Sequence, residues 1–423
     1  MKGNLVRNSV MLASFTVLLG MSSAVFAEET SELTPGVTVV ADDDSATGYT
    51  VTFVYEDADA EQVQLRGAFT FYNDEEDVRG TTPETYATPE EWENGMFEAG
   101  DESLTVDMEK VDGTDYWTVS MPLPGGHYQY VFLVNGDEET GLEDPTNPME
   151  ASGVENGNNY NRSTFYVPYD AEKQSESIDF SYMAPREDEQ SGEVIYVNYT
   201  DVNGDAAPMG IYLPYGYDES SKEPYKVLYL SHGGGGNETD WFAGGSVDYI
   251  FDNLIAEGTT EPVVLVTMNN SAYEWDFDVI VDNLVNCVIP YVEENYNVAT
   301  EEAGRAFAGL SMGGMTATNV LLQAPEEFGY VGIFSGADSS YDMSSVDLDA
   351  VKNTSVLMGA GIYDFGLVPA ADSEDEDTFS ITALAKVFDE NEITYGWSEV
   401  YGSHDWNTWP QLIKIFAEDY LWK

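Results

Sequence analysis

One serine of this chain lies between glycines in a position suited to chemistry. Ser311 belongs to the run GLSMGG over Gly309–Gly314, after an apolar strand expected over Arg305–Leu310 and before a helix expected over Met312–Gln323. A serine on such a tight strand-to-helix turn exposes its hydroxyl at the end of the sheet, and the flanking glycines let neighbouring chain approach without a Cβ clash. The helix N-terminus there also favours developing negative charge. The pattern predicts that Ser311 is a nucleophile.

A serine nucleophile needs a base, and the sequence holds three histidines that could supply one. His127 falls among short β-like runs. His232 directly precedes four glycines, and we expect it to shape their loop. His404 lies between the last expected strand and the last expected helix, where the base follows the acid in chain order. Position and elimination therefore favour His404 as the base.

The acid that orients this histidine is expected just after a strand, between the serine and the histidine in the chain. Asp364 closely follows a strand expected over 355–358, and we predict that it is the acid. This part of the chain is rich in carboxylates, and three of them remain alternatives: Asp338, Asp372 and Asp405.

The glycine run after His232 follows an apolar strand expected over 227–231. Backbone N–H groups of such a loop can bind an oxyanion, and we predict Gly233 or Gly234, together with Met312, as the donors. A phosphate-binding loop is excluded, since no Lys-Ser or Lys-Thr follows the glycines and 237–240 adds negative charge.

Aromatic residues cluster in or near the loops expected at the ends of the strands. Four tryptophans are candidates for substrate binding, either to a sugar or to an aromatic acyl group, with packing beneath the loops as the alternative: Trp241, Trp275, Trp406 and Trp409. The run Asp201–Asp205 resembles the start of a calcium loop but lacks the glutamate at the twelfth position, which favours a β-turn. No His/Cys cluster suits zinc. We therefore predict neither a metal nor a cofactor.

The elements that must position these residues change character along the chain. After about residue 49, short runs alternate apolar and polar residues, which predicts a small antiparallel β-sandwich. After about residue 194, continuous apolar strands alternate with helices, which predicts an α/β domain with a parallel sheet covered on both faces. We predict the following segments: a signal peptide over 1–27, a flexible acidic leader over 28–47, the β-sandwich over 48–168, a linker over 169–190 and the α/β domain over 191–423.

The first residues have the features of a bacterial-type secretory signal. Lys2 and Arg7 precede an apolar run over Val10–Leu19, and Ala24–Ala27 ends it with an A-x-A pattern. The run is too short to span a membrane. Cleavage after Ala27 would export a chain of 423 − 27 = 396 residues.

The composition of the whole chain excludes several function classes. Lys+Arg 15 against Asp+Glu 78 gives a net charge of −63, which repels nucleic-acid backbones and disfavours an anionic membrane surface. Hydrophobic content of 43% and aromatic content of 13% are too high for a disordered acidic chain. Cys287 is the single cysteine, so an internal disulfide is impossible. The oligomeric state is left open.

Four motifs in this order resemble carbohydrate esterase family one, and within it the feruloyl esterase domains of plant-cell-wall-degrading enzymes. They are HGGGGNETDW over His232–Trp241, IPYVEENY over Ile289–Tyr296, RAFAGLSMGG over Arg305–Gly314 and GSHDWNTW over Gly402–Trp409. The resemblance covers roughly 194–421. It implies an α/β-hydrolase fold and the same catalytic triad of serine, aspartate and histidine. An acidic insertion over Val368–Asp377 departs from the family pattern and bears on the size of the substrate.

The N-terminal part is similar to early-set Ig-like domains related to the family 48 carbohydrate-binding modules. The motifs are VTF over Val51–Phe53, WTVSMPLP over Trp117–Pro124, YQYVFLVNG over Tyr128–Gly136 and DPTN over Asp144–Asn147. The resemblance implies a domain that either binds glycan or packs on the esterase domain and shapes its entrance.

Together these observations predict a secreted serine esterase whose partner is plant cell-wall polysaccharide, with release of ferulate from arabinoxylan as the main hypothesis. An acetylxylan esterase on the same scaffold and a siderophore (enterochelin-type) esterase are the alternatives within the enzymes. A non-catalytic glycan-binding protein is the alternative from another class, and the intact serine, histidine and glycine-rich loop speak against it.

Overall fold

The structure of this chain is a computed structural model that describes residues 33–72, 86–99, 103–136, 141–148, 162–186, 188, 190–368 and 378–423. The expected signal peptide and residues 369–377 of the acidic insertion lie outside this description. None of the helices in the described ranges combines the length and the apolar character that a membrane span requires.

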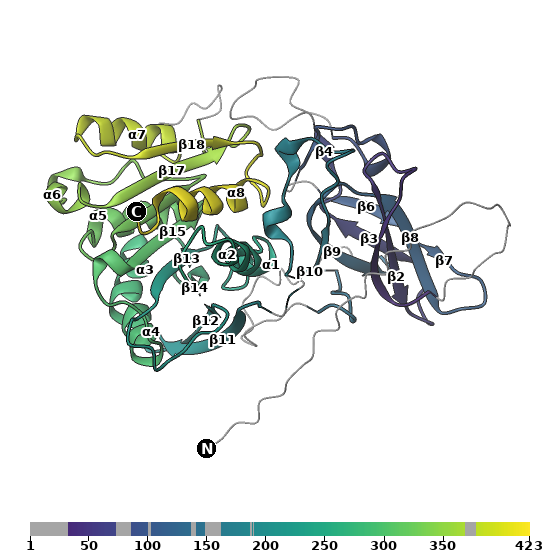
Figure 1. The fold of residues 1–423 in the computed structure, drawn as a ribbon, viewed down its shortest axis with the longest axis horizontal. Helices are drawn as coiled ribbons and strands as arrows, with labels where there is room; N and C mark the ends of the chain where they lie inside the picture. The colour runs from purple at the N-terminus through teal and green to yellow at the C-terminus, as the bar shows by residue number, and fades with distance from the viewer. Residues whose placement is uncertain are drawn as a thin grey trace, which may run out of the picture. The chain divides into compact units, whose positions relative to one another are not determined.

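An eight-stranded sheet forms the C-terminal half, in the order β11–β12–β14–β13–β15–β16–β17–β18 (Figure 1). Its strands are β11 (Glu193–Thr200), β12 (Ala206–Leu213), β13 (Lys226–Ser231), β14 (Val263–Met268), β15 (Arg305–Leu310), β16 (Tyr330–Phe334), β17 (Ser355–Gly361) and β18 (Gly396–Val400). From β14 through β18 all neighbours are parallel, as predicted. β12 instead runs antiparallel to both β11 and β14. The turn that joins β11 to β12 is too short for the crossover connection that a parallel pair needs.

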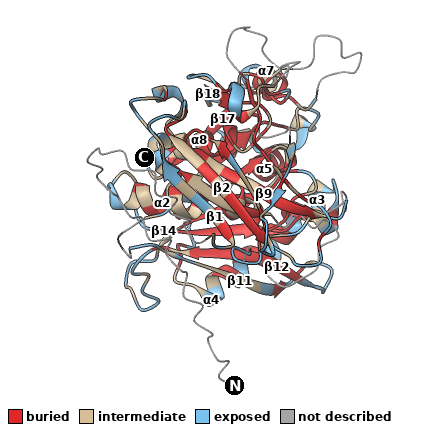
Figure 2. Cartoon of the chain, turned by 90° about the vertical axis from the view of Figure 1, so that its right-hand side faces the viewer, coloured by how far each residue is buried: buried red, intermediate tan, exposed pale blue. Residues whose placement is uncertain are grey.

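Helices cover both faces of this sheet, as the alternation of strands and helices predicts. They are α1 (Asp240–Ala243), α2 (Val247–Ala256), α3 (Phe277–Asn283), α4 (Ile289–Asn295), α5 (Met312–Gln323), α6 (Leu348–Val351), α7 (Ile381–Glu390) and α8 (Thr408–Ile415). Leu228 and Leu230 of β13 pack on the side of α2 and α8, whereas Val227 and Tyr229 pack on the side of α3, α4, α5 and α7. Successive side chains of a strand point to opposite faces of the sheet, so an apolar strand contributes side chains to both hydrophobic cores. In Figure 2, α5 and the inner strands are red.

Short 3₁₀ and π turns complete the helical structure. The 3₁₀ turns are Pro89–Glu91, Glu176–Ile178, Ser181–Met183, Ser271–Tyr273, Glu302–Gly304 and Met343–Ser345, and the π turns are Leu284–Val288 and Phe416–Tyr420. The first π turn separates α3 from α4, just before Pro290. Proline has no N–H to donate and clashes with the preceding turn, so the widened turn accommodates it.

The N-terminal half consists of antiparallel sheets. One has the order β1–β2–β8–β7, the second has the order β10–β9–β3–β6, and β4 pairs with β5. The strands are β1 (Gly36–Ala41), β2 (Tyr49–Glu56), β3 (Val63–Gly67), β4 (Phe71–Tyr72), β5 (Phe97–Glu98), β6 (Leu104–Asp107), β7 (Glu109–Lys110), β8 (Tyr116–Pro122), β9 (Gly126–Val134) and β10 (Ser163–Val167). Phe53 of the first sheet meets Tyr130 of the second edge to face, with ring centroids 5.3 Å apart. The two four-stranded sheets therefore share one core, while the Ig-like resemblance stays a prediction.

Part of the segment predicted as a flexible leader is a strand. β1 pairs along its whole length with β2, from Gly36 opposite Val54 to Ala41 opposite Tyr49. Its alternating Val37 and Val39 pack against the common core. The many acidic residues around 42–44 obscure this short period-two pattern in the sequence.

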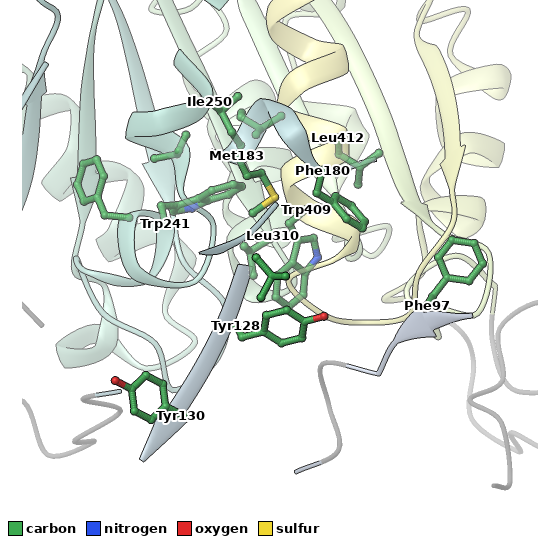
Figure 3. Packing of buried hydrophobic residues seen from close by; sticks show 14 of the residues in the cluster. Phe97, Tyr128, Tyr130, Phe180, Met183, Trp241, Ile250, Leu310, Trp409 and Leu412 are labelled. Carbon is green, nitrogen blue, oxygen red and sulfur yellow. The ribbon is translucent and has the colours of Figure 1, made fainter. Parts of the chain in front are cut away.

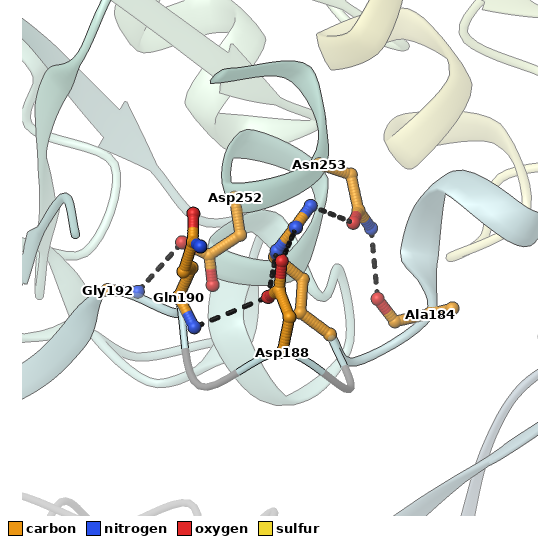
Figure 4. Close-up of polar contacts among 7 residues, drawn as sticks. Ala184, Asp188, Gln190, Gly192, Asp252 and Asn253 are labelled. Atoms are coloured by element: carbon orange, nitrogen blue, oxygen red, sulfur yellow. Dashed lines mark hydrogen bonds and ion pairs between the residues drawn. The ribbon is translucent and has the colours of Figure 1, made fainter. Parts of the chain in front are cut away.

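The segment predicted as a linker, 169–190, is anchored to α2 (Figure 4). Asn253 Nδ2 donates a hydrogen bond to the carbonyl oxygen of Ala184 at 2.9 Å, drawn in Figure 4. It donates a second to the carbonyl oxygen of Tyr182 at 3.0 Å. Phe180 and Met183 are buried, and Figure 3 shows them between Tyr128 of β9 and the helices of the large sheet. These apolar side chains are removed from water by contacts with both halves of residues 35–423. The segment is therefore part of the core that joins the two halves.

Candidate active site

The predicted nucleophile lies on a strained turn between β15 and α5. Ser311 has φ 55° and ψ −118°, a conformation that costs a non-glycine residue about 1–3 kcal/mol. A Cβ on Gly309 would lie 2.1 Å from the carbonyl oxygen of Gly313, and a Cβ on Gly313 would lie 2.4 Å from that of Ser231. The two glycines are therefore required because backbone from the same turn and from the end of β13 occupies the space of a side chain.

Ser311, His404 and Asp364 form a hydrogen-bonded relay. His404 Nε2 is 2.9 Å from Ser311 Oγ, and its Nδ1 is 2.8 Å from Asp364 Oδ1. The side chain of His404 is 13% exposed, whereas that of Asp364 is fully buried. A carboxylate beside Nδ1 favours the tautomer with hydrogen on Nδ1, which leaves Nε2 free to accept the serine proton. This arrangement can deprotonate the serine and stabilise the resulting imidazolium.

The buried acid is held by its own loop. Gly366 N–H donates to Asp364 Oδ1 at 2.6 Å, and among the described residues no group bonds to the buried Oδ2. The alternative acids lie elsewhere: Asp338 Oδ1 accepts from Ser340, and Asp405 Oδ1 accepts from the N–H of Asn407. Asp372 lies outside the described residues. The structure thus brings Asp364, and neither described alternative, to His404 Nδ1.

His232 fixes the conformation of the glycine-rich loop. Its buried ring has Nδ1 2.7 Å from the carbonyl oxygen of Gly233 and Nε2 2.9 Å from the N–H of Asn270. These partners require a donor at Nδ1 and an acceptor at Nε2, which is the neutral ring. Burial lowers the pKa of His232 to about 4, so the ring stays neutral near pH 7.

The same contact selects between the two predicted oxyanion donors. In a trans peptide the N–H points away from the C=O, so the N–H of Gly234 points away from His232 when the carbonyl of Gly233 points toward it. Gly234 and Met312 both line the cavity beside the nucleophile. Met312 begins α5, where a helix leaves its N–H without an internal partner. The geometry favours Gly234 over Gly233 as the partner of Met312.

This inner cavity has a volume of about 490 Å³ and is lined by Gly234, Gly235, Ser271, Glu274, Trp275 and Met312. Among the predicted tryptophans, Trp275 lines it and is 56% exposed. Trp241 and Trp409 are buried instead, and their Nε1 atoms donate to Ser231 O (3.0 Å) and Ser335 Oγ (2.9 Å). Trp406 packs edge-on against both of these rings. Their bonded N–H groups and buried rings make Trp241 and Trp409 supports of the loops, and Trp406 packs with them.

Aromatic residues that sequence reasoning missed flank the histidine. Phe365 is 48% exposed and stacks on His404, with ring centroids 4.1 Å apart. Phe379 in turn stacks on Phe365 at 5.6 Å. The one signal in the sequence is that Phe365 directly follows the predicted acid, Asp364. Glu274, which lines the inner cavity, was also missed.

The N-terminal half contacts the loops that carry the acid and the base. Phe97 of β5 stacks on Tyr401, three residues before His404, with centroids 4.9 Å apart and planes 6° apart. Asn407 Nδ2 donates to the carbonyl oxygen of Glu98 at 2.7 Å. Burial and the nearby Asp405 raise the pKa of Glu98 well above its ordinary value. The first domain therefore supports the catalytic loops directly.

In the acidic turn between β11 and β12, the carboxylate of Asp201 accepts hydrogen bonds from nearby groups of the protein. Asp201 Oδ1 accepts from the N–H groups of Asn203 and Asp205, and Oδ2 accepts from the hydroxyl of Tyr273. Within the described residues, no group of three or more His, Cys, Asp and Glu side chains could hold a metal ion.

Comparisons with known proteins identify the family. Residues 202–418 match the family described as putative esterase. The endo-1,4-beta-xylanase/feruloyl esterase of Xylanibacter ruminicola is 36% identical over 170 residues, which are 37% of this chain and 23% of that protein. The endo-1,4-beta-xylanase Y of Acetivibrio thermocellus is 32% identical over 158 residues, 35% of this chain and 14% of that protein. The chain thus spans about a quarter or less of the length of these relatives.

Among solved structures, the enterobactin esterase of Shigella flexneri is similar over 92% of this chain and 96% of its own, with a TM-score of 0.52 and 16% sequence identity. This likeness confirms the predicted α/β-hydrolase fold preceded by an all-β domain. Since the family match covers half of the residues, including the serine turn and the loops of the relay, this chain belongs to the putative esterase family.

Proposed function

We propose that this chain is a secreted serine esterase that acts on plant cell-wall polysaccharide and releases ferulate from arabinoxylan. The observation that carries the proposal is the relay of Ser311, His404 and the buried Asp364, next to two backbone donors. A serine, a base and an orienting acid within hydrogen-bond distance are the requirements for acyl transfer through a covalent intermediate.

In the proposed reaction each residue of the relay has one role. Ser311 Oγ attacks the ester carbonyl carbon while His404 Nε2 takes its proton, and the carbonyl oxygen becomes an oxyanion bound by the N–H groups of Gly234 and Met312. The sugar alkoxide leaves with the proton from His404, and an acyl-enzyme remains. Water then gives a proton to His404 and attacks the acyl carbon. The bond between the acyl carbon and Ser311 Oγ breaks, ferulate is released, and His404 returns the proton to Ser311 Oγ. Asp364 holds the imidazole and stabilises its charged form throughout.

The substrate and the location rest on three supports. The relatives named above act, by their names, as xylanases and as a feruloyl esterase. The exposed rings of Trp275 and Phe365 flank the site and suit an aromatic acyl group. The pattern over 1–27 supports secretion, and a charge of −63 opposes binding of nucleic acid or an anionic membrane.

A siderophore esterase is the second candidate, favoured by one observation. The likeness to the enterobactin esterase extends over both domains, beyond the range of the family match. This likeness concerns the fold, and the substrates separate the two functions.

The test is a parallel assay of the full chain on methyl ferulate, acetylated xylan and a catechol-type siderophore trilactone, with Ser311→Ala as the blank. We expect ferulate release that the blank lacks. Acetate release alone would assign a small acyl pocket, and trilactone cleavage alone would assign the second candidate. A fluorophosphonate probe that labels Ser311→Ala as strongly as the unaltered chain would refute the catalytic role of this serine.

A further inference from the structure

A second cavity adjoins the inner cavity. This outer cavity has a volume of about 900 Å³ and lies among the loop after β14, the segment after β16 and α5. Of the described residues, Glu274 and Trp275 line both cavities. The two spaces therefore share a wall, and a ligand that reaches past this wall occupies both.

Trp275 links the oxyanion loop to the outer cavity. A Cβ on Gly234 would lie 3.5 Å from Trp275 Cζ2, which is ordinary van der Waals contact. The ring of Phe277 meets the indole of Trp275 edge-on, with ring centroids 6.3 Å apart. The indole thus extends from beside the predicted oxyanion donor into the outer cavity, with more than half of its surface exposed.

The outer cavity combines aromatic rings with hydrogen-bond acceptors. Beside Trp275 and Tyr341, its described lining includes four carboxylates: Glu274, Asp276, Asp278 and Asp338. None of its described lining residues carries a positive charge. Such a lining repels phosphate and carboxylate ligands. A neutral ligand with many hydroxyl groups fits it, because hydroxyls donate to carboxylates and the apolar faces of sugar rings pack on aromatic rings.

Two of these carboxylates are already oriented by the protein. Asp338 Oδ1 accepts from Ser340 N (3.0 Å) and Oγ (2.6 Å), and its Oδ2 accepts from Asn319 Nδ2 (3.1 Å). Asp278 Oδ1 accepts from Gln323 Nε2 at 2.8 Å. Carboxylates fixed by neutral donors retain lone pairs in set directions, which suits hydroxyl donors from a ligand.

We infer that the outer cavity is a binding site for the neutral sugar chain of the substrate, with Trp275 and Tyr341 as its ring contacts. The inference rests on the proposed function for the identity of the chain as a substituted xylan. Its volume lies at the upper end of the range for ligand pockets, which suits several sugar rings better than one. The inner cavity then holds the acyl group.

The first experiment compares two substrates of the full-length enzyme: methyl ferulate, which has no sugar, and a feruloylated arabinoxylo-oligosaccharide. Tyr341 lines the outer cavity but not the inner cavity. Tyr341→Ala should therefore raise KM for the oligosaccharide about 3- to 10-fold. KM for methyl ferulate and kcat for both substrates should change less than about twofold. Exposed Tyr215 provides the matched control, Tyr215→Ala, which should change neither. An equal rise of KM for both substrates would assign the outer cavity to the acyl group and overturn the inference.

The second experiment does not depend on ester hydrolysis. Calorimetry of Ser311→Ala with an unesterified arabinoxylo-oligosaccharide should show binding that Trp275→Ala weakens and the control Trp397→Ala, on β18, does not. Binding without ferulate release would refute the proposed substrate but uphold the sugar site. Absence of oligosaccharide binding in an enzyme that still cleaves methyl ferulate would overturn the inference but leave the proposed function intact. Binding of the cation tetramethylammonium, without binding of the oligosaccharide, would also overturn the inference. Asp338→Asn serves as a second variant if Tyr341→Ala lowers the melting temperature.

Discussion

Replacing His232 tests whether the glycine-rich loop positions an oxyanion donor. The ring makes two buried hydrogen bonds, one from Nδ1 to the carbonyl oxygen of Gly233 (2.7 Å) and one from the N–H of Asn270 to Nε2 (2.9 Å). Asparagine can place an amide donor near the position of Nδ1, and glutamine can place an acceptor near that of Nε2. His232→Asn therefore keeps the contact that orients the Gly233–Gly234 peptide, whereas His232→Gln loses it.

The expected magnitudes follow from these contacts. Each variant leaves one buried polar backbone group without a partner, which costs about 1–3 kcal/mol of folding stability. Removal of an oxyanion donor lowers kcat by about 10²–10³. We expect His232→Gln to lower kcat about 100-fold and His232→Asn less than about 10-fold. KM should stay within about threefold in both, since the oxyanion forms only in the transition state.

The assay is steady-state hydrolysis of p-nitrophenyl acetate and methyl ferulate, with urea unfolding of each variant. Similar losses of stability together with a clear difference in kcat would support the positioning role of His232. Equal kcat values for the two folded variants would refute the reasoning, because the Gly233 contact would then have no influence on the transition state.

The pH dependence of stability gives a second check on the same residue. The pKa of His232 is lowered to about 4 in the folded state from 6.5, so the unfolded chain binds the proton first as pH falls. The stability that the neutral ring contributes is present above pH 6.5 and is lost as pH falls toward 4, by about 3 kcal/mol in all. The destabilisation by His232→Asn should therefore be smaller at pH 4 than at pH 7.5, as urea unfolding at both values would measure. An unchanged difference would contradict the assigned protonation state.

Three further predictions concern other parts of the fold. Gly313→Ala places a Cβ 2.4 Å from a backbone carbonyl oxygen, so we expect a loss of about 3 kcal/mol in urea unfolding and a fall in kcat, and an unaltered stability would contradict the close packing of the turn. Burial raises the pKa of Asp248 to about 7 from 3.8, so its neutral form favours folding and that contribution is lost as pH rises from about 4 to 7. Asp248→Asn should then stabilise the protein by about 2 kcal/mol at pH 8 and hardly at all at pH 4, and an equal effect at both would refute the raised pKa. Phe97→Ala removes the ring that stacks on Tyr401, which should lower the free energy of unfolding by about 3 kcal/mol and lower kcat by disturbing the loop that carries His404. Phe97→Leu should have a smaller effect on both. An unaltered kcat would show that the first domain does not support that loop.

Local patterns in the sequence determine much of this protein. The bounds of β15 and α5 agree with the predicted strand and helix on either side of Ser311, because an apolar run and a glycine-flanked turn are features of neighbouring residues. Chain order and elimination then predicted His404, and the position just after a strand predicted Asp364 among several carboxylates; the structure brings both together with the serine. The alternation of apolar strands and helices predicted the layered α/β domain for the same local reason.

Only the tertiary structure determined the contacts between residues that are far apart in the chain. Ser311 and His404 are 93 residues apart and meet because parallel strands end at the same edge of the sheet. Burial separated Trp275, which lines both cavities, from the tryptophans that support the loops, although all have the same side chain. The stacking of Phe365 on His404 and the contacts of the first domain with the catalytic loops also join segments with no common local pattern. A sequence reports the periodicity of each element, whereas the space between elements is set by how their apolar faces pack together.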